Sequence, residues 1–555
     1  MVKKVLKYIL FSLLGIVVLF IGLLTYMYLS ADMGEPNVKI DINKYSVTDS
    51  ITYKSCNGNF IRKNKQGLWE AYLHGSPIDR GIAMGMLSKD LLYYQEKVFV
   101  DEIRTFIPSD SYLRFLKFFT VVFNRNLGEY IPQEYREEIY GISLLCTHEY
   151  DMIGTPYERQ INYHAAHDIG HTMQEYMLVG CSSFAVWGNK SADSTLLVGR
   201  NFDFYVGDDF AKNRLVMFVA PSNGYKFVSI GWAGMIGVLS GMNEMGLTVT
   251  INAAKGSLPM SSAMPISLLA REILQYASTI EEAYDIAKKR HTFVSESLLI
   301  GSAKDGNAAI IEKSPSKIGL FYSADNEVIC TNHYQSDIFK NDSYNMENIR
   351  MSDSPYRYKR IEQLLKNKGK IAYKDAANIL RDRLGTSSED IGLANEKSIN
   401  QSIAHHSVIF KPQQGLMWVS TSPWQSGEYI CYNINDIFLK EKISGEVTKL
   451  DYTIGADSIF IKNDYTKLLE YRLLVKIIKK AIKDKRVISA DTMQRFIVVN
   501  PNMYYVYDLL GDYYLNVLSN TKFAKAMWNK ALMREIPKVA EKNLIEEKLK
   551  KLENE

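Results

Sequence analysis

The chain has 555 residues, of which 46% are hydrophobic and 23% are charged, and its formal net charge is +4 at pH 7. This length predicts two or three domains, and the composition is that of an ordinary globular protein with a hydrophobic core. So small a net charge gives no support to nucleic-acid binding. The five cysteines are too few and too scattered for a disulfide scaffold or a zinc finger, and their odd number leaves at least one thiol free.

An almost uninterrupted apolar run extends from Tyr8 to Leu29 and is long enough to cross a bilayer as a helix. Lys3, Lys4 and Lys7 precede it, and no comparable basic cluster follows directly. By the positive-inside rule, we expect residues 1–31 to anchor the chain in a membrane, with a cytoplasmic N-terminus and an exported main body. A cleaved signal peptide is the alternative, although no clear small-x-small cleavage site follows the run.

Residues 32–180 are expected to form a helical leader segment. Its helical patterns include 78–96 and 112–124. His164, His167 and His171 lie at positions i, i+3 and i+7, so they share one face if this part is helical. The spacing is compatible with a metal site or a cap over an active site. We prefer a polar helix face without a ligand, because no carboxylate is placed as in a known zinc pattern.

From Cys181 onward, short β runs alternate with Gly and Asn turns. The predicted strands lie at 183–187, 196–198, 215–219, 225–230, 237–240, 247–252, 297–300, 308–312, 318–323, 328–331, 407–410 and 416–420. The predicted helices lie at 265–276, 280–289, 356–366 and 373–382. Strands, then helices, then strands fit an α+β domain of two stacked antiparallel sheets with helices outside, spanning residues 181–455.

Residues 456–555 are helical in pattern and more charged. The run from Tyr507 to Tyr514, followed by Ala524 and Trp528, resembles a tetratricopeptide helix pair. One convincing repeat is too little for a free-standing solenoid, so we expect this tail to pack on the catalytic domain. A structural cap is favoured over a module that docks a protein partner.

We interpret Cys181 as a nucleophile that becomes an N-terminus when the chain cuts itself after Gly180. Its sulfur would attack the Gly180 carbonyl, and water would then release the upstream segment. The new α-amine has an ordinary pKa of about 7.7–8.0 and the thiol one of about 8.5, so one residue supplies the nucleophile and its base. Gly180 has no side chain to block the attack. A buried, inert cysteine is the alternative.

Four further residues offer what this chemistry needs. Arg200 is a cation that lowers the pKa of a thiol, and Asp203 is an acceptor for the new ammonium. An ordinary surface ion pair between the two is the alternative. Asn252 and Asn332 lie near the ends of apolar β runs and are candidate donors to the oxyanion.

Five blocks occur in a characteristic order in this region. They are Gly-Cys-Ser-Ser-Phe at 180–184, Gly-Arg-Asn-Phe-Asp-Phe at 199–204, Met-Asn-Glu-Met-Gly-Leu at 242–247 with Asn252 after it, Thr-Asn-His at 331–333 and Ser-Pro-Tyr-Arg-Tyr at 354–358. This set resembles the acyl-coenzyme A:6-aminopenicillanate acyltransferase family, a branch of the N-terminal nucleophile hydrolases related to penicillin V acylase and bile salt hydrolase. The resemblance covers roughly residues 175–430 and implies a four-layer αββα sandwich.

The resemblance assigns both self-cleavage and turnover to Cys181. It also implies a late catalytic arginine, and the pattern favours Arg357 over Arg360. A dyad between Cys181 and either His405 or His406 is not expected, because an N-terminal nucleophile needs no histidine. Asn201 and Asn243 are expected to hold turns, with Gly246 allowing positive φ.

Together these features predict a membrane-anchored, exported, self-processing cysteine hydrolase or acyltransferase. Its small-molecule substrate would be an N-acyl amine or N-acyl amino acid, and no metal or bound cofactor is implied. One alternative is an acyltransferase that uses an acyl thioester as donor. Export argues against coenzyme A as the carrier of that donor, because coenzyme A is chiefly cytoplasmic. The other alternative is a non-catalytic envelope scaffold. The leader is much longer than in bile salt hydrolases, so its fate after cleavage stays open.

Overall fold

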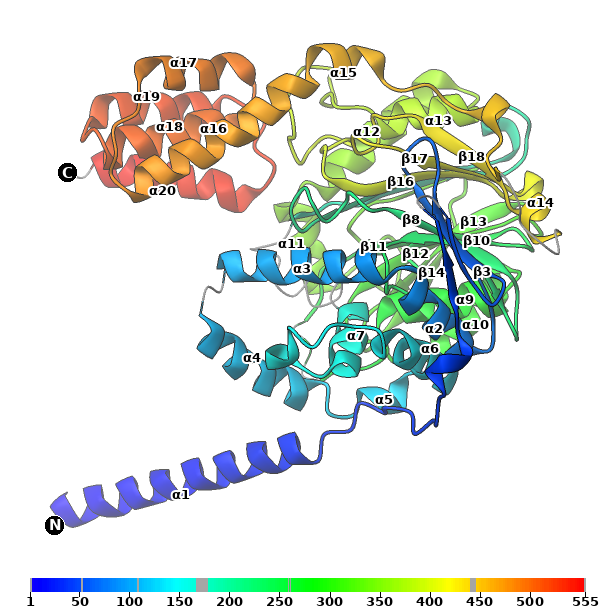
Figure 1. Cartoon of the computed structure of the whole chain (residues 1–555). Coiled ribbons are helices and arrows are strands. Elements are labelled where there is room, and N and C mark those ends of the chain that lie inside the picture. The colour runs from blue at the N-terminus through cyan, green and yellow to red at the C-terminus, as the bar shows by residue number, and fades with distance from the viewer. Residues whose placement is uncertain are drawn as a thin grey trace.

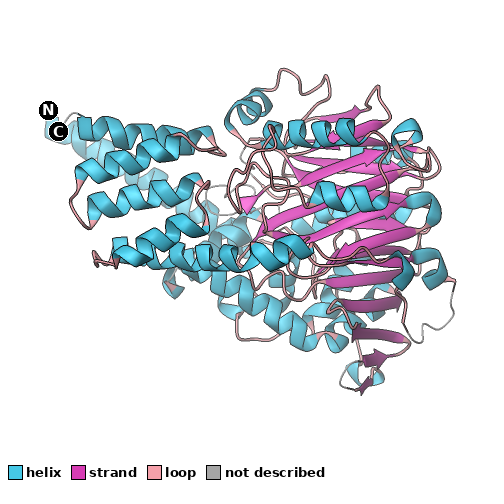
Figure 2. Ribbon diagram, turned by 90° about the horizontal axis from the view of Figure 1, so that it is seen from above, coloured by secondary structure: helices cyan, strands magenta, loops and turns pink. Residues whose placement is uncertain are grey.

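The structure is a computed structural model that describes residues 2–50, 53–106, 109–165, 178–257, 259, 261–439 and 446–553. Two β-sheets lie face to face at its centre, and helices cover the outer face of each (Figures 1 and 2). The C-terminal helices form a lobe beside this sandwich, and the first helix projects away from it (Figure 1). The described part of the chain therefore has the four layers αββα that the sequence predicts.

The larger sheet has 11 strands and carries the leader segment at one end. In spatial order they are β1 (Val47–Asp49), β2 (Tyr53–Cys56), β3 (Asn59–Lys63), β4 (Trp69–Gly75), β8 (Leu215–Pro221), β9 (Phe227–Gly231), β10 (Ser240–Asn243), β11 (Leu247–Ala253), β12 (Glu296–Ser302), β13 (Asn307–Lys313) and β14 (Ile318–Phe321). Strands β4 and β8 pair in parallel from Trp69 opposite Leu215 to Gly75 opposite Pro221. The leader, which is expected to be helical, contains helices and also supplies four strands to this sheet from its first part.

The second sheet holds the residues that surround Cys181. Its main path runs through β15 (Glu327–Cys330), β6 (Ser182–Val186), β7 (Leu197–Tyr205), β16 (Ala404–Lys411), β17 (Leu416–Ser420) and β18 (Tyr429–Asn433), and β5 (Leu178–Val179) pairs with β7. The sequence predicts only the first two residues of β7. The rest of this strand carries buried polar side chains, which break the apolar pattern of a core strand.

Side-chain alternation along the strands explains the layers. On β12, Leu299 packs between the two sheets, whereas Leu298 and Ile300 face the helices on the other side of the larger sheet. On β16, Val408 packs between the sheets and Ile409 faces the helices that cover the smaller sheet. Successive residues of a strand point to opposite faces, so strands covered on both sides are apolar throughout.

Helices of the leader and helices that follow Cys181 in the chain both cover the sheets. In chain order they are α2 (Pro77–Leu87), α3 (Lys89–Phe106), α4 (Asp110–Phe123), α5 (Leu127–Tyr130), α6 (Gln133–Ser143), α7 (Pro156–His164), α9 (Ile266–Tyr276), α10 (Ile280–Lys289), α11 (Ser343–Met351), α12 (Ser354–Lys368), α13 (Tyr373–Leu380) and α14 (Ile434–Phe438). Helices α2, α6, α9 and α10 cover the larger sheet, and α12 and α13 cover the smaller one. The four helices predicted between 265 and 382 are confirmed, whereas α11 and β18 are not predicted from the sequence.

The C-terminal lobe has a hydrophobic core of its own. It consists of α15 (Ser458–Asn463), α16 (Tyr465–Lys483), α17 (Ala490–Val499), α18 (Tyr504–Asn516), α19 (Thr521–Leu532) and α20 (Val539–Glu553). Trp528 packs so closely on α18 that a side-chain carbon at Gly511 would lie 2.3 Å from its indole nitrogen. The lobe also packs on the β-sandwich, from which Trp424 joins the core of the lobe.

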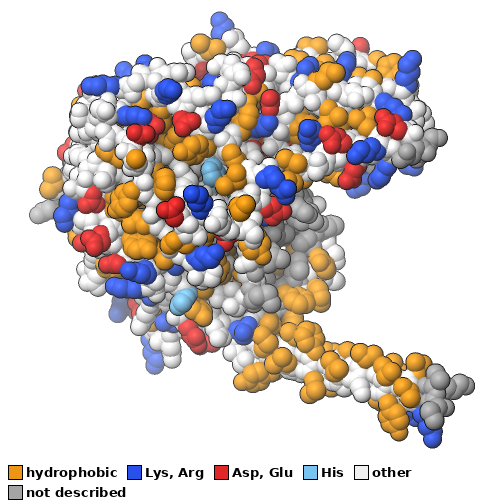
Figure 3. Space-filling view, turned by 180° about the vertical axis from the view of Figure 1, so that it is seen from behind, with side chains coloured by type: hydrophobic (Ala, Val, Ile, Leu, Met, Phe, Trp, Pro, Cys, Tyr) orange, Lys and Arg blue, Asp and Glu red, His pale blue; other side chains and the backbone are white. Residues whose placement is uncertain are grey.

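Helix α1 (Val2–Leu29) is long and apolar enough to cross a membrane. Its mean hydropathy over residues 4–29 is 2.6, none of that span is buried, and hydrophobic side chains cover its surface (Figure 3). A signal sequence near an N-terminus has the same properties. The helix is therefore a membrane anchor or a signal sequence.

Candidate active site

The Gly180–Cys181 peptide bond lies inside a continuous antiparallel ladder. Upstream of it, Val179 pairs with Phe204, and downstream Ser182 pairs with Asn201. Between these pairs, the Gly180 N–H donates to the Asp203 carbonyl oxygen at 3.1 Å. Because both flanks are paired with β7, the bond is held in a fixed, extended geometry next to the polar residues of that strand.

The thiol of Cys181 faces the guanidinium group of Arg200. The Arg200 Nη2 donates to the Cys181 Sγ at 3.7 Å, and both side chains are fully buried. Burial raises the pKa of the Cys181 thiol to about 11, and the nearby Asp203 carboxyl adds to this, whereas Arg200 opposes it. In the uncut chain the thiol is therefore protonated at neutral pH.

Arg200 is fixed by a set of backbone and side-chain contacts. Its Nη1 donates to the Leu239 carbonyl oxygen at 3.0 Å and to the Ser240 hydroxyl, and its Nη2 donates to the Ile251 carbonyl oxygen. Its guanidinium carbon lies 4.4 Å from the centre of the Phe202 ring. These contacts leave the cation beside the sulfur with little freedom, which is the arrangement that stabilises a thiolate.

Asp203 is a buried carboxyl with no hydrogen-bonding partner among the residues that the structure describes. Burial raises its pKa to about 8, although the positive charges of Arg357 and Arg200 oppose the shift. A buried acceptor without a donor is costly, so such a group usually has a role that the static contacts leave out.

Arg357 bridges the two ends of the site. Its Nη1 donates to the Cys181 carbonyl oxygen at 2.6 Å, and its Nη2 donates to the Asn332 Oδ1 at 2.7 Å. Its Nε donates to Asp353 at 3.1 Å, which fixes the third side of the fork. Arg360 instead donates to both carboxylate oxygens of Asp382 at 2.8 Å, away from Cys181. Of the two arginines considered, Arg357 is the one that lies at the site.

The side-chain amides of Asn252 and Asn332 donate to carbonyl oxygens other than that of Gly180. Asn252 donates its Nδ2 to the Cys330 carbonyl oxygen at 3.0 Å, and Asn332 donates its Nδ2 to the Ala253 carbonyl oxygen at 2.9 Å. The Gly180 carbonyl oxygen accepts from Gln401 at 3.2 Å. Gln401 lies in an irregular loop and belongs to no recognisable motif, so the sequence offers no signal for it.

Residues 188–422 match the family model described as acyl-coenzyme A:6-aminopenicillanic acid acyl-transferase. The match covers less than half of the chain, which is similar to that family over this region. The match includes Arg200, Asp203, Asn252 and Arg357, and it begins after Cys181. We call the part of the chain that contains this match the acyl-transferase-type domain.

Curated relatives extend the similarity beyond this region. The chain is 26% identical over 346 residues to an uncharacterized protein of Archaeoglobus fulgidus, covering 55% of this chain and 56% of that protein. It is 22% identical over 269 residues to protein dcd1B of Dictyostelium discoideum, covering 45% of this chain and 51% of that protein. The chain thus spans about half the length of the curated relatives it matches.

Two solved structures show a weak likeness to the acyl-transferase-type domain. One is a Caenorhabditis elegans N-acylethanolamine-hydrolyzing acid amidase ortholog, with a TM-score of 0.31, 16% identity, and coverage of 42% of this chain and 93% of that one. The other is a mutant of conjugated bile acid hydrolase from Clostridium perfringens, with a TM-score of 0.31, 13% identity, and coverage of 48% and 95%. At such TM-scores the likeness carries no weight beside the layers described above.

The histidines near the site contact other groups. His406 lies 2.8 Å from the Ser240 hydroxyl and 3.4 Å from Arg200, and His405 lies 3.0 Å from His406 between their Nδ1 atoms. Burial lowers the pKa of His405 to about 3, so it is neutral at physiological pH. His406 therefore contacts Arg200 and Ser240, and His405 contacts His406.

Of the three histidines on the predicted helix face, only His164 lies among the described residues; His167 and His171 lie outside them. The Ile236 N–H donates to the His164 Nε2 at 2.9 Å, so the opposite nitrogen donates to the Gln160 carbonyl oxygen at 2.7 Å. Burial lowers the pKa of His164 to about 4. This ring is a neutral structural link between the leader and the acyl-transferase-type domain. Within the described part of the chain, no group of three or more His, Cys, Asp or Glu residues is placed to hold a metal ion.

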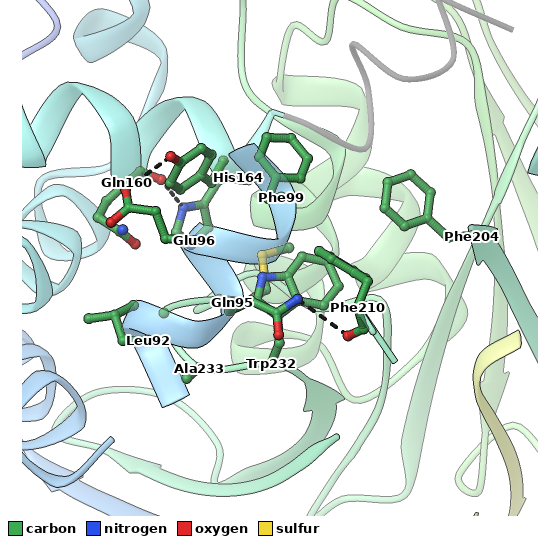
Figure 4. Close-up of a pocket in the computed structure, with 13 residues that line it drawn as sticks. Leu92, Gln95, Glu96, Phe99, Gln160, His164, Phe204, Phe210, Trp232 and Ala233 are labelled. Atoms are coloured by element: carbon green, nitrogen blue, oxygen red, sulfur yellow. Dashed lines mark hydrogen bonds between the residues drawn. The ribbon is translucent and has the colours of Figure 1, made fainter. Parts of the chain in front are cut away.

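An apolar pocket lies next to the site, between the leader and the acyl-transferase-type domain (Figure 4). Its lining comprises Leu92, Gln95, Glu96, Phe99, Gln160, Tyr163, His164, Phe204, Phe210, Trp232, Ala233, Gly234 and Met235. The Phe204 ring stacks on Phe202 at 5.6 Å, which connects the pocket to the strand beside Cys181. The cavity volume is about 30 Å³, so the pocket is nearly filled in the uncut chain.

Proposed function

We propose that the protein is a self-processing cysteine amidohydrolase that cleaves linear C–N amide bonds of N-acyl amines or N-acyl amino acids. Cys181 would be the nucleophile in both self-cleavage and turnover. The observation that carries the proposal is the burial of Asp203: its unpartnered carboxyl lies on the residue that pairs with Gly180, beside the bond whose cleavage creates a new ammonium group. The membrane-anchored, extracytoplasmic placement is part of the same proposal.

Self-cleavage would begin with attack of the Cys181 sulfur on the Gly180 carbonyl carbon. The carbonyl becomes a tetrahedral oxyanion, the C–N bond breaks, and a thioester forms between Gly180 and the Cys181 side chain. In net, the proton lost by the thiol ends on the Cys181 nitrogen. We expect Asp203 to carry it, because the pKa of this carboxyl is raised to about 8. Water then hydrolyses the thioester and leaves a Gly180 carboxylate and a free thiol.

Turnover would use the groups that cleavage exposes. The new α-amine takes the thiol proton as the sulfur attacks the substrate amide, and it returns a proton to the departing amine. Asp203 holds the ammonium form, and Arg200 stabilises the thiolate. Asn252 and Asn332 each have a second amide hydrogen available for the oxyanion. Arg357 fixes Cys181 through its carbonyl oxygen, and water finally discharges the acyl-enzyme.

The leader would remain bound after cleavage as part of the enzyme. Glu138 of the leader lies between Arg80 of the leader at 2.6 Å and Arg271 of α9 at 2.8 Å, and all three side chains are buried. The leader also supplies four strands to the larger sheet. Breaking a buried ion pair is strongly unfavourable, so these contacts should keep the leader associated with the rest of the protein after cleavage.

The apolar pocket is the site we propose for the acyl group of the substrate. Aromatic and aliphatic side chains dominate its lining, which suits a hydrocarbon or aromatic acyl chain. Its walls come from the leader and from the domain after Cys181, so side chains of both parts would define the size of the acyl group that fits. The family match also keeps an acyl-transferase as second candidate, in which an acceptor amine replaces water in the last step.

The test is hydrolysis of a panel of N-acyl ethanolamines and N-acyl amino acids with graded acyl chains, with and without a second amine as acceptor. The proposal predicts release of free acid, an acyl adduct on Cys181 by mass, and no activity in Cys181→Ala. Acyl transfer to the added amine in preference to water would favour the acyl-transferase. A wild type that hydrolyses none of the panel and forms no adduct would favour a non-catalytic scaffold.

A further inference from the structure

Gln401 occupies the position from which a donor acts on the Gly180 carbonyl. Its Nε2 donates to the Gly180 carbonyl oxygen at 3.2 Å, and the side chain is 2% exposed. A side-chain carbon on residue 180 would lie 2.4 Å from this nitrogen. The amide therefore reaches the carbonyl only because residue 180 is glycine.

The loop around Gln401 is held in place from the catalytic domain. The Asn201 Nδ2 donates to the Ile399 carbonyl oxygen at 3.0 Å, and the Ser402 N–H donates to the Asn400 Oδ1 at 3.0 Å. Ser402 has a φ of +56°, which is uncommon for a residue other than glycine. These contacts fix the backbone on both sides of Gln401, as a preorganised donor requires.

The C-terminal lobe holds the same loop through one side chain. Arg472 of α16 donates its Nη2 to the Ser402 carbonyl oxygen at 2.7 Å and its Nη1 to Asp208 at 2.7 Å. Its guanidinium carbon also lies 4.6 Å from the centre of the Trp424 ring. Arg472 is thus a clamp between the helical lobe and the residue next to Gln401.

We propose that Gln401 is a catalytic residue of self-cleavage, the donor that stabilises the oxyanion on Gly180, and that Arg472 is a positioning residue through which the helical lobe controls this step. The inference rests on the proposed self-cleavage at Gly180–Cys181. When the sulfur adds to the carbonyl carbon, the electron pair of the C=O bond moves to the oxygen, and the hydrogen bond from Gln401 strengthens as that charge develops. When the C–N bond breaks, the electron pair on the oxygen re-forms the C=O bond of the thioester. The electron pair of the C–N bond leaves on the Cys181 nitrogen, which takes up the proton lost by the thiol.

The test follows the rate of self-cleavage by intact mass in the full-length protein. Gln401→Met keeps the volume of the side chain and removes the donor. Loss of one oxyanion donor costs about 10²-fold or more, so cleavage should slow by about that factor with an unchanged melting temperature. Gln425→Met is the matched control, since Gln425 is equally buried and does not contact Gly180; it should cleave at the wild-type rate.

Arg472→Gln tests the clamp. It should slow cleavage by about tenfold, because a small displacement of a catalytic group is enough for such a loss. Arg472→Lys should recover part of the rate, since it retains one donor to Ser402. Arg495→Gln is the control on the same lobe, where Arg495 pairs with Glu470 at an exposed site.

The outcomes separate the two levels of the proposal. A wild type that cleaves while Gln401→Met cleaves equally fast overturns the role of Gln401 and leaves Cys181 in place. Slowing in Arg472→Gln only in proportion to a lower melting temperature overturns the clamp. A wild type that never cleaves overturns self-processing itself and, with it, the role of Gln401.

Discussion

The Arg357 guanidinium donates to the carbonyl oxygen of Cys181 at 2.6 Å and thereby ties helix α12 to the start of β6. The same side chain donates to Asn332 and to Asp353, so one arginine sets the relative positions of Cys181, the proposed nucleophile, and a candidate oxyanion donor. Three contacts in a rigid fork give this group a geometry that a lysine does not reproduce.

Replacing Arg357 by lysine should therefore lower the turnover of N-acyl substrates by about 10²-fold while the protein remains folded. The loss should be mainly in kcat, because the side chain positions the nucleophile and does not line the apolar pocket. Steady-state kinetics on the cleaved enzyme checks this. Arg360→Lys is the control: Arg360 pairs with Asp382, so activity per folded molecule should stay within about twofold. Equal losses in both variants would contradict the role given to Arg357.

Asp203 should make the stability of the uncut chain fall as pH rises. Its carboxyl has an ordinary pKa of 3.8 in the unfolded chain and one of about 8 when folded, so the folded chain holds the proton throughout the interval between them. Stability is then lost between about pH 4 and pH 8, with a limiting slope of about 1.4 kcal/mol per pH unit. Urea unfolding of Cys181→Ala and of the double variant Cys181→Ala with Asp203→Asn, at several pH values, measures the contribution of Asp203 to the free energy of unfolding.

The difference between those two variants should decrease with pH across this interval. Buried histidines such as His164 titrate in the opposite sense, but they are present in both proteins and cancel. Parallel stability curves would show that Asp203 is ionised in the folded, uncut chain. In the cleaved protein the ammonium group of Cys181 would face the Asp203 carboxylate. Replacing Asp203 by asparagine should then no longer flatten the dependence of stability on pH.

Glu138 should be essential for the association of the leader with the rest. Glu138→Ala leaves Arg80 and Arg271 buried without their counter-charge, which should lower the free energy of unfolding by about 3–5 kcal/mol. Urea denaturation measures the loss, and gel filtration of the cleaved variant should show release of the leader. Glu137→Ala is the control on the same helix, because the hydrogen bond that Glu137 accepts from Gln133 is exposed, and its effect should stay near 0.5 kcal/mol or less, about the limit for surface sites.

The predictable part of the fold is the part with regular apolar alternation. Most strands after Cys181 and four helices between residues 265 and 382 follow from their patterns because both faces of each sheet are covered, whereas α11 and β18 do not. Strand β7 is an exception: its buried Arg200 and Asn201 donate to carbonyl oxygens of segments far away in the sequence, which periodicity does not reveal. The leader strands escape prediction for a related reason, since β1 is exposed and polar and is defined by its partner strand.

The sequence motifs predict which residues lie at the site better than they predict what those residues contact. The block that contains Arg357 identifies a residue that lies against Cys181, and turn residues such as Asn243 and Gly246 have the predicted geometry, with a φ of +74° at Gly246. The assignment of Asn252 and Asn332 as oxyanion donors stays a prediction, and the sequence gives no signal for Gln401, from which the Gly180 carbonyl accepts. A donor supplied by an irregular loop depends on the packing of the whole domain, which a single sequence does not encode in any local pattern.

The most direct measurement is N-terminal sequencing with intact mass of the purified full-length protein, beside Cys181→Ala. Self-processing predicts a new N-terminus at Cys181 and two chains that separate only on denaturation, with a single uncut chain in the variant. Cleavage at Gly180–Cys181 in both proteins would mean that another protease makes the cut. A wild type that remains one chain under conditions in which it is folded would contradict the central claim that Cys181 acts as a self-generated N-terminal nucleophile.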